Sequence, residues 1–290
     1  MKIVVFSRGD VSNMIGVLSE GTAEQRVIDV TEMVGWKFEP FLAKGDEGIE
    51  ELKKTLLESS SQSYAMDSIS IDAPVVPHAR IFGIGLNYED HATESKMETQ
   101  KVPTVFMKLA SSVIGDGGEI ELPASVTQPD YEAELAVVIG KGGHKIAAAD
   151  WEQHVAGYTI LNDVSARDVQ LATSQWTLGK SFPTFSPVGP WIVTKDEISD
   201  PHTLDIKLSI DGETLQDSNT KYLIFRVPEL IEYISGIVPL QPGDIISTGT
   251  PSGVGLGREP KRWIKPGEEI VIEISSIGKL SNKAKAAEQA

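Results

Sequence analysis

The sequence contains no cysteine among its 290 residues. This absence excludes disulfide bonds, thiolate metal sites, iron–sulfur clusters and a cysteine nucleophile. A chain without cysteine is compatible with a reducing compartment, and we expect a cytoplasmic location.

Long apolar runs are also absent. A helix that crosses a bilayer needs about 18–20 apolar residues, whereas one of the longest runs here, Leu135–Ile139, has the length of a strand. The first ten residues are typical of a strand followed by a turn, and their apolar stretch is too short for a secretory signal. We therefore expect no membrane association.

Basic residues are scarce relative to acidic ones. The chain has 26 Lys and Arg against 42 Asp and Glu, which gives a formal net charge of −16. Such a surface repels phosphate backbones and anionic lipids, so nucleic-acid and membrane partners are not expected. If the substrate is a small anion, local cations or a metal ion must reverse the field at its site.

The distribution of elements predicts two domains, because the chain is long for one core. Residues 1–70 are typical of a small N-terminal α/β domain, with a strand at Lys2–Ser7 and an amphipathic helix at Asp46–Ser59. Residues 71–290 are dominated by short strands and turns, so the predicted class is α+β, mainly β. The expected strands are Ile81–Ile84, Val105–Lys108, Glu132–Ile139, Tyr158–Asn162, Trp191–Thr194, Leu204–Ile210, Asp244–Ser247 and Glu269–Ile274.

A few shorter signals complete the prediction. Asp211-Gly212 separates two strand-like stretches and predicts a hairpin turn. From Arg80 onward three further helices are expected, at Ala148–His154, Ala166–Leu171 and Val227–Ile237.

Several familiar motifs fail. The stretch Gly83–Tyr88 begins like a dinucleotide-binding loop, but Tyr88 occupies the third glycine position. Gly179–Ser181 ends like a phosphate-binding loop, but the first required glycine is Ser174. A zinc site is not expected either, since no two of the five histidines have close ligand spacing. Four histidines are expected at the surface: His78, His144, His154 and His202.

The acidic residues Glu132, Glu134 and Asp163 form the most informative pattern. Residues two apart on a strand share a face, so Glu132 and Glu134 project together from a strand expected to be half-buried. Asp163 ends a second predicted strand. Three carboxylates suit an octahedral Mg²⁺ or Mn²⁺ and leave about three positions for water and substrate. The alternative is a solvated strand face.

Six segments in order resemble the fumarylacetoacetate hydrolase family, in its acylpyruvase and diketo-acid hydrolase branch. The resemblance extends from Arg80 to Leu280 and implies a β-roll catalytic domain (a mixed β-sandwich), a homodimer and bound Mg²⁺. The family's metal ligands correspond to Glu132, Glu134 and Asp163. The matching segments are Gly85–His91, Phe106–Lys108, Tyr131–Leu135, Asn162–Gln170, Gly179–Phe182 and Thr248–Gly255.

Two residues are candidates for activating water. His91 lies in a polar stretch after a strand, and Glu94 could orient its imidazole if the stretch is helical. The alternative is a surface histidine with local charge contacts. The family uses a His–Glu pair at this spacing, so the resemblance implies that His91 and Glu94 are catalytic.

Further candidates would surround the metal. Lys180 could stabilise a substrate carboxylate or an enolate oxygen, or form a surface ion pair instead. Thr250 lies in a glycine-rich turn that could bind a carboxylate, or that simply ends a strand. Lys108, Tyr131 and Gln170 are weaker candidates for substrate binding. Arg167 and Asp168 are expected to form a structural pair.

These features predict a divalent-metal-dependent hydrolase of C–C bonds in 2,4-diketo acids. In this hypothesis the metal binds the 2-oxo-carboxylate, His91 deprotonates water, and the metal and Lys180 stabilise the leaving enolate. Oxaloacetate decarboxylation, hydration of a 2-oxo-enoate and keto–enol tautomerisation at the same centre are open alternatives. An alternative of another class is a catalytically silent binding protein on the same scaffold.

Overall fold

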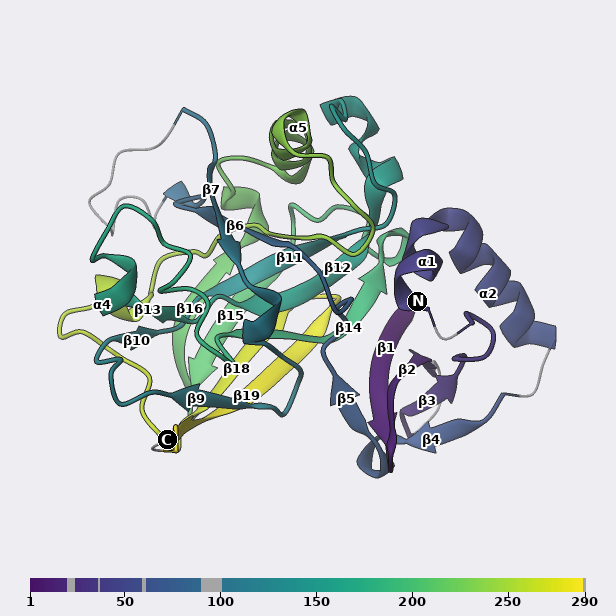
Figure 1. Ribbon diagram of the computed structural model, residues 1–290, viewed down its shortest axis with the longest axis horizontal. Coiled ribbons are helices and arrows are strands. Elements are labelled where there is room, and N and C mark those ends of the chain that lie inside the picture. The colour runs from purple at the N-terminus through teal and green to yellow at the C-terminus, as the bar shows by residue number, and fades with distance from the viewer. Residues whose placement is uncertain (20–23, 36, 59–60, 90–100, 289–290) are drawn as a thin grey trace.

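The computed structural model describes residues 1–19, 24–35, 37–58, 61–89 and 101–288 (Figure 1). A 12-stranded mixed sheet forms its centre. Two of the twelve strands lie off the main path: β5 (Ser70–Asp72) pairs with β1, and β8 (Val113–Ile114) pairs with β14. From edge to edge, the main path is β4 (Ser63–Ala65), β3 (Arg26–Asp29), β2 (Val11–Leu18), β1 (Lys2–Arg8), β14 (Ser186–Thr194), β12 (Val155–Asn162), β11 (Ala133–Ile139), β17 (Ile245–Ser247), β6 (Ile81–Gly85) and β7 (Thr104–Lys108).

A second sheet packs against the middle of the first. Side chains of both sheets, such as Leu135 and Ile160 from one and Leu208 and Ile272 from the other, belong to one buried cluster. The predicted mainly β class and mixed sandwich are therefore confirmed. The strand order of the second sheet is β16 (Glu213–Asn219), β15 (Asp205–Ile210), β18 (Glu269–Ile274), β19 (Gly278–Ala286) and β9 (Glu119–Leu122).

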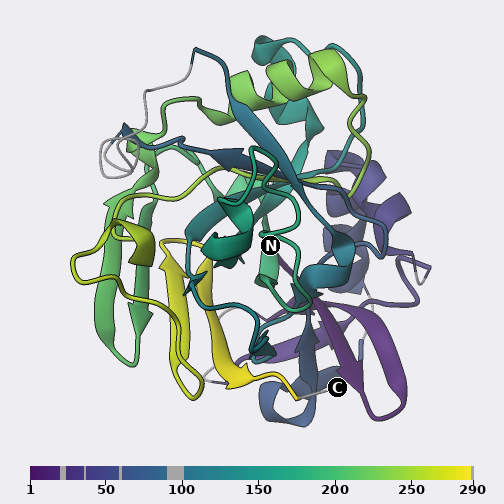
Figure 2. The same ribbon diagram turned by 60° about the vertical axis from the view of Figure 1, so that its left-hand side comes forward.

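The N-terminal strands extend the central sheet. β1 pairs with β14 through Lys2↔Val193 and Ile3↔Ile192, so this part of the chain, purple in Figures 1 and 2, adds strands beside β14. The helices α1 (Phe38–Ala43) and α2 (Asp46–Glu58) belong to it. Phe41 and Leu52 from these helices join a buried cluster with Val138 of β11. A domain boundary at residue 70 stays a prediction.

Strand β11 is buried on both faces. All seven residues of Ala133–Ile139 are buried, so the expectation of a half-buried strand is wrong. The strand has β12 and β17 as hydrogen-bonded neighbours, the second sheet covers one face, and Val138 contacts the N-terminal cluster on the other. The acidic side chains of this strand consequently lie inside the protein.

The remaining elements are short. Helix α5 (Val227–Ile237) forms as predicted, and Asp211-Gly212 turns the β15–β16 hairpin with positive φ angles of 49° and 82°. The predicted helix at 148–154 is a 3-10 helix. Of the helix predicted at 166–171, only α4 (Arg167–Gln170) is helical. β10 (Pro129–Asp130) pairs with β13 (Ser165–Ala166). The 3-10 turns span Met66–Ser68, Ala110–Ser112, Ala148–His154, Lys195–Glu197, Thr220–Tyr222 and Gly255–Gly257.

No helix in the described ranges has the length and apolar character that a bilayer crossing requires.

The prediction that His202 lies at the surface is wrong, because the residue is only 7% exposed. Its Nδ1 lies 2.8 Å from Asp200 Oδ1, and its Nε2 accepts the N–H of Val227, the first residue of α5, at 3.2 Å. Because a backbone N–H can only donate, Nε2 carries no proton and the ring is neutral. The imidazole thus satisfies a free N–H at the start of α5.

We expect His202 to make the stability of the fold depend on pH. Burial lowers the pKa of His202 below 6.5, although the Asp200 carboxylate opposes the shift. As the pH falls, His202 takes up a proton in the unfolded chain before it does so in the folded protein. The contribution of neutral His202 to the free energy of unfolding is therefore complete above the pKa of the unfolded chain and is lost as the pH falls through the pKa of the folded protein. Between about pH 7 and about pH 5 the wild type should therefore lose more stability than His202→Gln in denaturant titrations. The exposed His144 is the control: an equal pH dependence in His202→Gln and His144→Gln would contradict the role of His202.

Candidate metal centre

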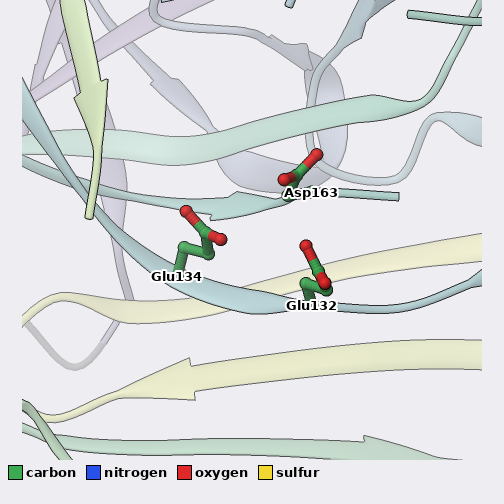
Figure 3. A group of neighbouring side chains, drawn as sticks. All are labelled: Glu132, Glu134 and Asp163. Carbon is green, nitrogen blue, oxygen red and sulfur yellow. The ribbon is translucent and has the colours of Figure 1, made fainter. Parts of the chain in front are cut away.

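Three carboxylates meet where β11 and β12 run side by side. Glu132 directly precedes β11, Glu134 is its second residue, and Asp163 directly follows β12. The antiparallel register pairs Ala133 with Asn162, and the Asp163 N–H donates to the Glu132 carbonyl at 2.9 Å. Figure 3 shows Glu132 and Glu134 on one strand and Asp163 beside them on its neighbour. One carboxylate oxygen from each residue lies within 4.8 Å of the other two.

Buried cations compensate two of these carboxylates. Lys180 Nζ lies 2.5 Å from Glu132 Oε2 and 2.6 Å from Asp163 Oδ2. The second oxygen of Asp163 binds Lys108 Nζ at 2.6 Å, and the second oxygen of Glu132 binds Arg167 Nη2 at 2.5 Å. Lysine and arginine thus contact both oxygens of each of these two carboxylates.

Glu134 has a different environment. Its Oε2 accepts hydrogen bonds from Ser247 Oγ at 2.5 Å and from the Gly249 N–H at 3.0 Å. Among the described residues no lysine or arginine forms an ion pair with it. Burial, together with the charges of Asp163 and Glu132, raises the pKa of Glu134 to about 8. In the described part of the chain this carboxylate therefore has no direct ion-pair partner, and the charge of Lys180 offsets the rise in its pKa only in part.

The lysine ammonium groups respond to the same surroundings. Burial lowers the pKa of Lys180, but the charges of Asp163 and Glu132 outweigh it and leave that pKa raised. Burial dominates at Lys108, and its pKa is lowered despite the contact with Asp163. The site is a buried network in which every charge depends on its partners.

The three acidic residues fit a divalent metal. Their carboxylates are hard oxygen donors, they lie within reach of one ion, and their mutual repulsion is the kind that a cation relieves. Glu132, Glu134 and Asp163 would hold the ion, as the sequence predicted. This donor set suits Mg²⁺ or Mn²⁺ and does not choose between them.

Asp130 was not singled out in the sequence, yet it supports Glu132 through Arg167. Its buried carboxylate accepts the N–H groups of Gly255 at 2.7 Å and Leu256 at 2.9 Å, and it pairs with Arg167 Nε at 2.9 Å. Arg167 in turn binds Glu132. The expected Arg167–Asp168 pair is wrong, because Asp168 accepts from Thr127 instead. The sequence offered one signal for this role: Asp130 is an acidic residue immediately before the Tyr131–Leu135 segment.

The predicted substrate-binding residues surround the carboxylates. Tyr131 is buried and donates its hydroxyl to the Gly253 carbonyl at 3.1 Å, and Gln170 Oε1 accepts from Arg167 at 2.9 Å. Thr250 is 3% exposed and lies one residue after Gly249, which contacts Glu134. Their roles in substrate binding stay predictions.

Lys108 has no N–H left for a substrate in this arrangement. Its ammonium contacts Asp163, the Lys180 carbonyl at 2.5 Å and the Val164 carbonyl at 3.3 Å, which occupies all three donors. The predicted catalytic residues His91 and Glu94 lie outside the described residues.

Comparison with known proteins identifies the family. The family model described as "Fumarylacetoacetate (FAA) hydrolase C-terminal" matches residues 80–285. The chain belongs to the fumarylacetoacetate hydrolase family. The predicted resemblance is therefore confirmed, and the three carboxylates, the two lysines and Thr250 all lie within the matched segment.

Curated relatives of this family member cover most of the chain. A Xenopus laevis protein named "Oxaloacetate tautomerase fahd2, mitochondrial" is 43% identical over 244 residues, which are 83% of this chain and 76% of that protein. The human protein named "Oxaloacetate tautomerase FAHD2A, mitochondrial" is 46% identical over 213 residues, which are 73% of this chain and 68% of that protein.

Solved structures agree with the fold over the whole chain. A fumarylacetoacetate hydrolase from Exiguobacterium antarcticum has a TM-score of 0.85 and 32% identity, covering 99% of this chain and 100% of its own. A maleylpyruvate hydrolase from Sphingobium, in complex with manganese(II) and pyruvate, has a TM-score of 0.83, 29% identity and the same coverage. These similarities show that the chain is an enzyme of this family.

Proposed function

We propose that this enzyme is a divalent-metal-dependent tautomerase that interconverts the keto and enol forms of oxaloacetate or a closely similar 2-oxo diacid. The observation that carries the proposal is the buried cluster of Glu132, Glu134 and Asp163, with Lys180 against it, in a chain 43–46% identical to proteins named oxaloacetate tautomerases. Tautomerisation was one of the alternatives left open by the sequence, and the relatives favour it over C–C hydrolysis.

The chain's own residues can serve this chemistry. A metal held by the three carboxylates would supply Lewis acidity toward the 2-oxo oxygen. The Lys180 ammonium is held in place by Glu132 and Asp163, so it can donate to an oxygen on which negative charge develops. Lys108 forms a buried ion pair with Asp163, and Arg167 forms one with Glu132. Burial excludes bulk water, which strengthens each of these interactions.

Electrostatics also favours a small dianion as substrate. The whole chain carries a net charge of −16, but at the carboxylate cluster the buried cations Lys108, Arg167 and Lys180 offset the charges of Asp130, Glu132 and Asp163. A divalent ion would add to them and make this one region attractive to carboxylates.

Hydrolysis of 2,4-diketo acids is the second candidate. It is favoured by the 29% identity with a maleylpyruvate hydrolase whose structure contains manganese and pyruvate. His91 and Glu94, predicted to activate water, belong to this reaction.

The test compares both reactions on one preparation. Chelator-treated enzyme should lack activity, and added Mg²⁺ or Mn²⁺ should restore it. Activity is measured as the decrease in the ultraviolet absorbance of the enol form of oxaloacetate. Acylpyruvates and fumarylpyruvate should react more slowly, and pyruvate formation from oxaloacetate should reveal any decarboxylation. Full activity without metal, or faster cleavage of the diketo acids, would contradict the proposal.

His91→Ala separates the two reactions further. If His91 activates water, this variant should retain metal affinity and lose any hydrolysis of diketo acids. Measured Mn²⁺ binding provides the control for folding. Unchanged hydrolysis in the variant would exclude His91 as the base.

The compartment, the homodimer and the choice of metal remain predictions. The tautomerases named above are described as mitochondrial, and the maleylpyruvate hydrolase binds manganese. We propose a metal-loaded homodimer, which gel filtration with metal analysis tests directly. The cytoplasmic location is tested by fractionation of cells that express the chain.

A further inference from the structure

Gln216 connects the second sheet to the candidate metal centre. It lies on β16 and is 1% exposed. Its Oε1 accepts the N–H of Ala133 at 2.9 Å, and Ala133 is the residue between Glu132 and Glu134. Its Nε2 donates to Thr250 Oγ1 at 2.8 Å and to the Pro251 carbonyl at 2.9 Å. One buried amide thus contacts both the metal-binding strand and the glycine-rich turn.

The backbone groups determine which way this amide faces. The Ala133 N–H can only donate, so it must meet the oxygen of the amide, and the Pro251 carbonyl can only accept, so it must meet the nitrogen. The amide therefore has one orientation, even though its oxygen and nitrogen have similar shapes. Its nitrogen then has one remaining N–H, which points to Thr250.

This orientation determines the state of the Thr250 hydroxyl. Because Thr250 Oγ1 accepts from Gln216, its own proton must point elsewhere. No acceptor for that proton is found among the described residues. Thr250 is only 3% exposed, and the preceding Gly249 N–H donates to Glu134. The turn therefore presents an unused donor next to the metal-binding carboxylates.

We propose that Gln216 is a positioning residue that presets the Thr250 hydroxyl as a hydrogen-bond donor to the carboxylate of the bound oxo acid. The same side chain holds the backbone between two metal ligands. This inference rests on the proposed function, because it takes an oxo acid as the ligand. A Thr250 hydroxyl that is held as a donor favours a ligand carboxylate, which can only accept a hydrogen bond. It disfavours a ligand group that would have to donate a hydrogen bond at the same place.

Two variants of Gln216 separate its contacts. In Gln216→Glu, one oxygen still accepts the Ala133 N–H, and the other makes the Thr250 hydroxyl donate to it instead of to the ligand. The Pro251 carbonyl loses its donor in this variant. Gln216→Leu loses the contacts on both sides. Asp217→Asn, at the exposed next position of the same strand, is the matched control.

The measurements are made on Mn²⁺-loaded enzyme. Oxalate, which presents adjacent carboxylate oxygens as a 2-oxo acid does, is the binding probe in calorimetry. Gln216→Glu should weaken oxalate binding and raise the KM for oxaloacetate about tenfold or more, the loss expected for a hydrogen bond to a charged group. Its Mn²⁺ affinity should stay within about twofold of the wild type, since the Ala133 contact remains. Gln216→Leu should weaken Mn²⁺ binding as well.

Thr250 provides the decisive comparison. Thr250→Val should weaken oxalate binding as much as Gln216→Glu does, Thr250→Ser should restore it, and the double variant Gln216→Glu/Thr250→Val should be no worse than either single change. Additive losses in the double variant, or unchanged oxalate affinity in Gln216→Glu, would overturn the inference.

Two controls keep the test decisive. If Gln216→Glu fails to fold by circular dichroism, the Thr250→Val and Thr250→Ser pair still decides, because full oxalate affinity in Thr250→Val would overturn the inference. A wild type that binds Mn²⁺ and oxalate but does not convert oxaloacetate would contradict the proposed function alone, since the oxalate comparison needs no turnover.

Discussion

Replacing Asp163 by alanine is expected to abolish divalent-metal binding and also to destabilise the metal-free protein. The metal would lose one of three ligands. Lys108 and Lys180, both 2.6 Å from this carboxylate, would lose a buried partner. Removing one member of a buried ion pair costs about 3–5 kcal/mol, because the other charge remains without compensation.

Thermal unfolding with and without Mn²⁺ measures both effects of Asp163→Ala. The wild type should gain stability with Mn²⁺, since a ligand that binds only the folded state stabilises it, whereas the variant should start lower and gain nothing. Asp196→Ala is the matched control, because Asp196 also contacts a lysine, Lys53 at 2.8 Å, but is 44% exposed. Exposed pairs of this kind contribute about 0–1 kcal/mol. A metal-dependent stabilisation in Asp163→Ala equal to that of the wild type would contradict the site.

Glu134→Gln is expected to lose metal binding without loss of folding stability. Glutamine preserves an oxygen for the Ser247 hydroxyl and the Gly249 N–H. Because the pKa of Glu134 is raised to about 8, its carboxyl group is mostly protonated in the metal-free protein at pH 7, and glutamine replaces it with a neutral group of similar shape. The metal-free variant should therefore be as stable as the wild type or more stable by about 1 kcal/mol.

The contrast between the two variants tests the assignment of charges in the site. Mn²⁺ titration of Glu134→Gln should show an affinity at least about a hundredfold weaker than the wild type, because losing even a group that supports a metal ligand costs about 10–100-fold. Denaturant unfolding without metal gives its stability. A fall in stability as large as that of Asp163→Ala would show that Glu134, too, has a cationic partner in the metal-free protein.

Local pattern was sufficient for most of the secondary structure. The two-residue alternation of strands such as Glu269–Ile274 and the helical spacing of Val227–Ile237 are properties of neighbouring residues, and the structure has both elements within the predicted bounds. The same alternation placed Glu132 and Glu134 together, and the strand end placed Asp163 near them. These inferences need only the geometry of one strand and its partner.

Burial could not be predicted in this way. The alternating pattern of β11 indicated one solvated face, but Ala133–Ile139 is covered on both faces by elements from distant parts of the chain. His202 has the same explanation, because its ring is enclosed only when α5 begins beside it. Whether a polar residue is inside depends on which segments pack over it.

The alternating pattern and the order of motifs in the chain by themselves predicted a mainly β enzyme with three acidic candidate metal ligands, since both depend on residues close in sequence. Only the tertiary structure decided how those ligands are supported: which carboxylates Lys108, Lys180 and Arg167 neutralise, that Asp130 supports Arg167, and that Gln216 reaches Thr250. These partners lie on strands and turns separated by many residues, so their contacts exist only once the sheets have paired.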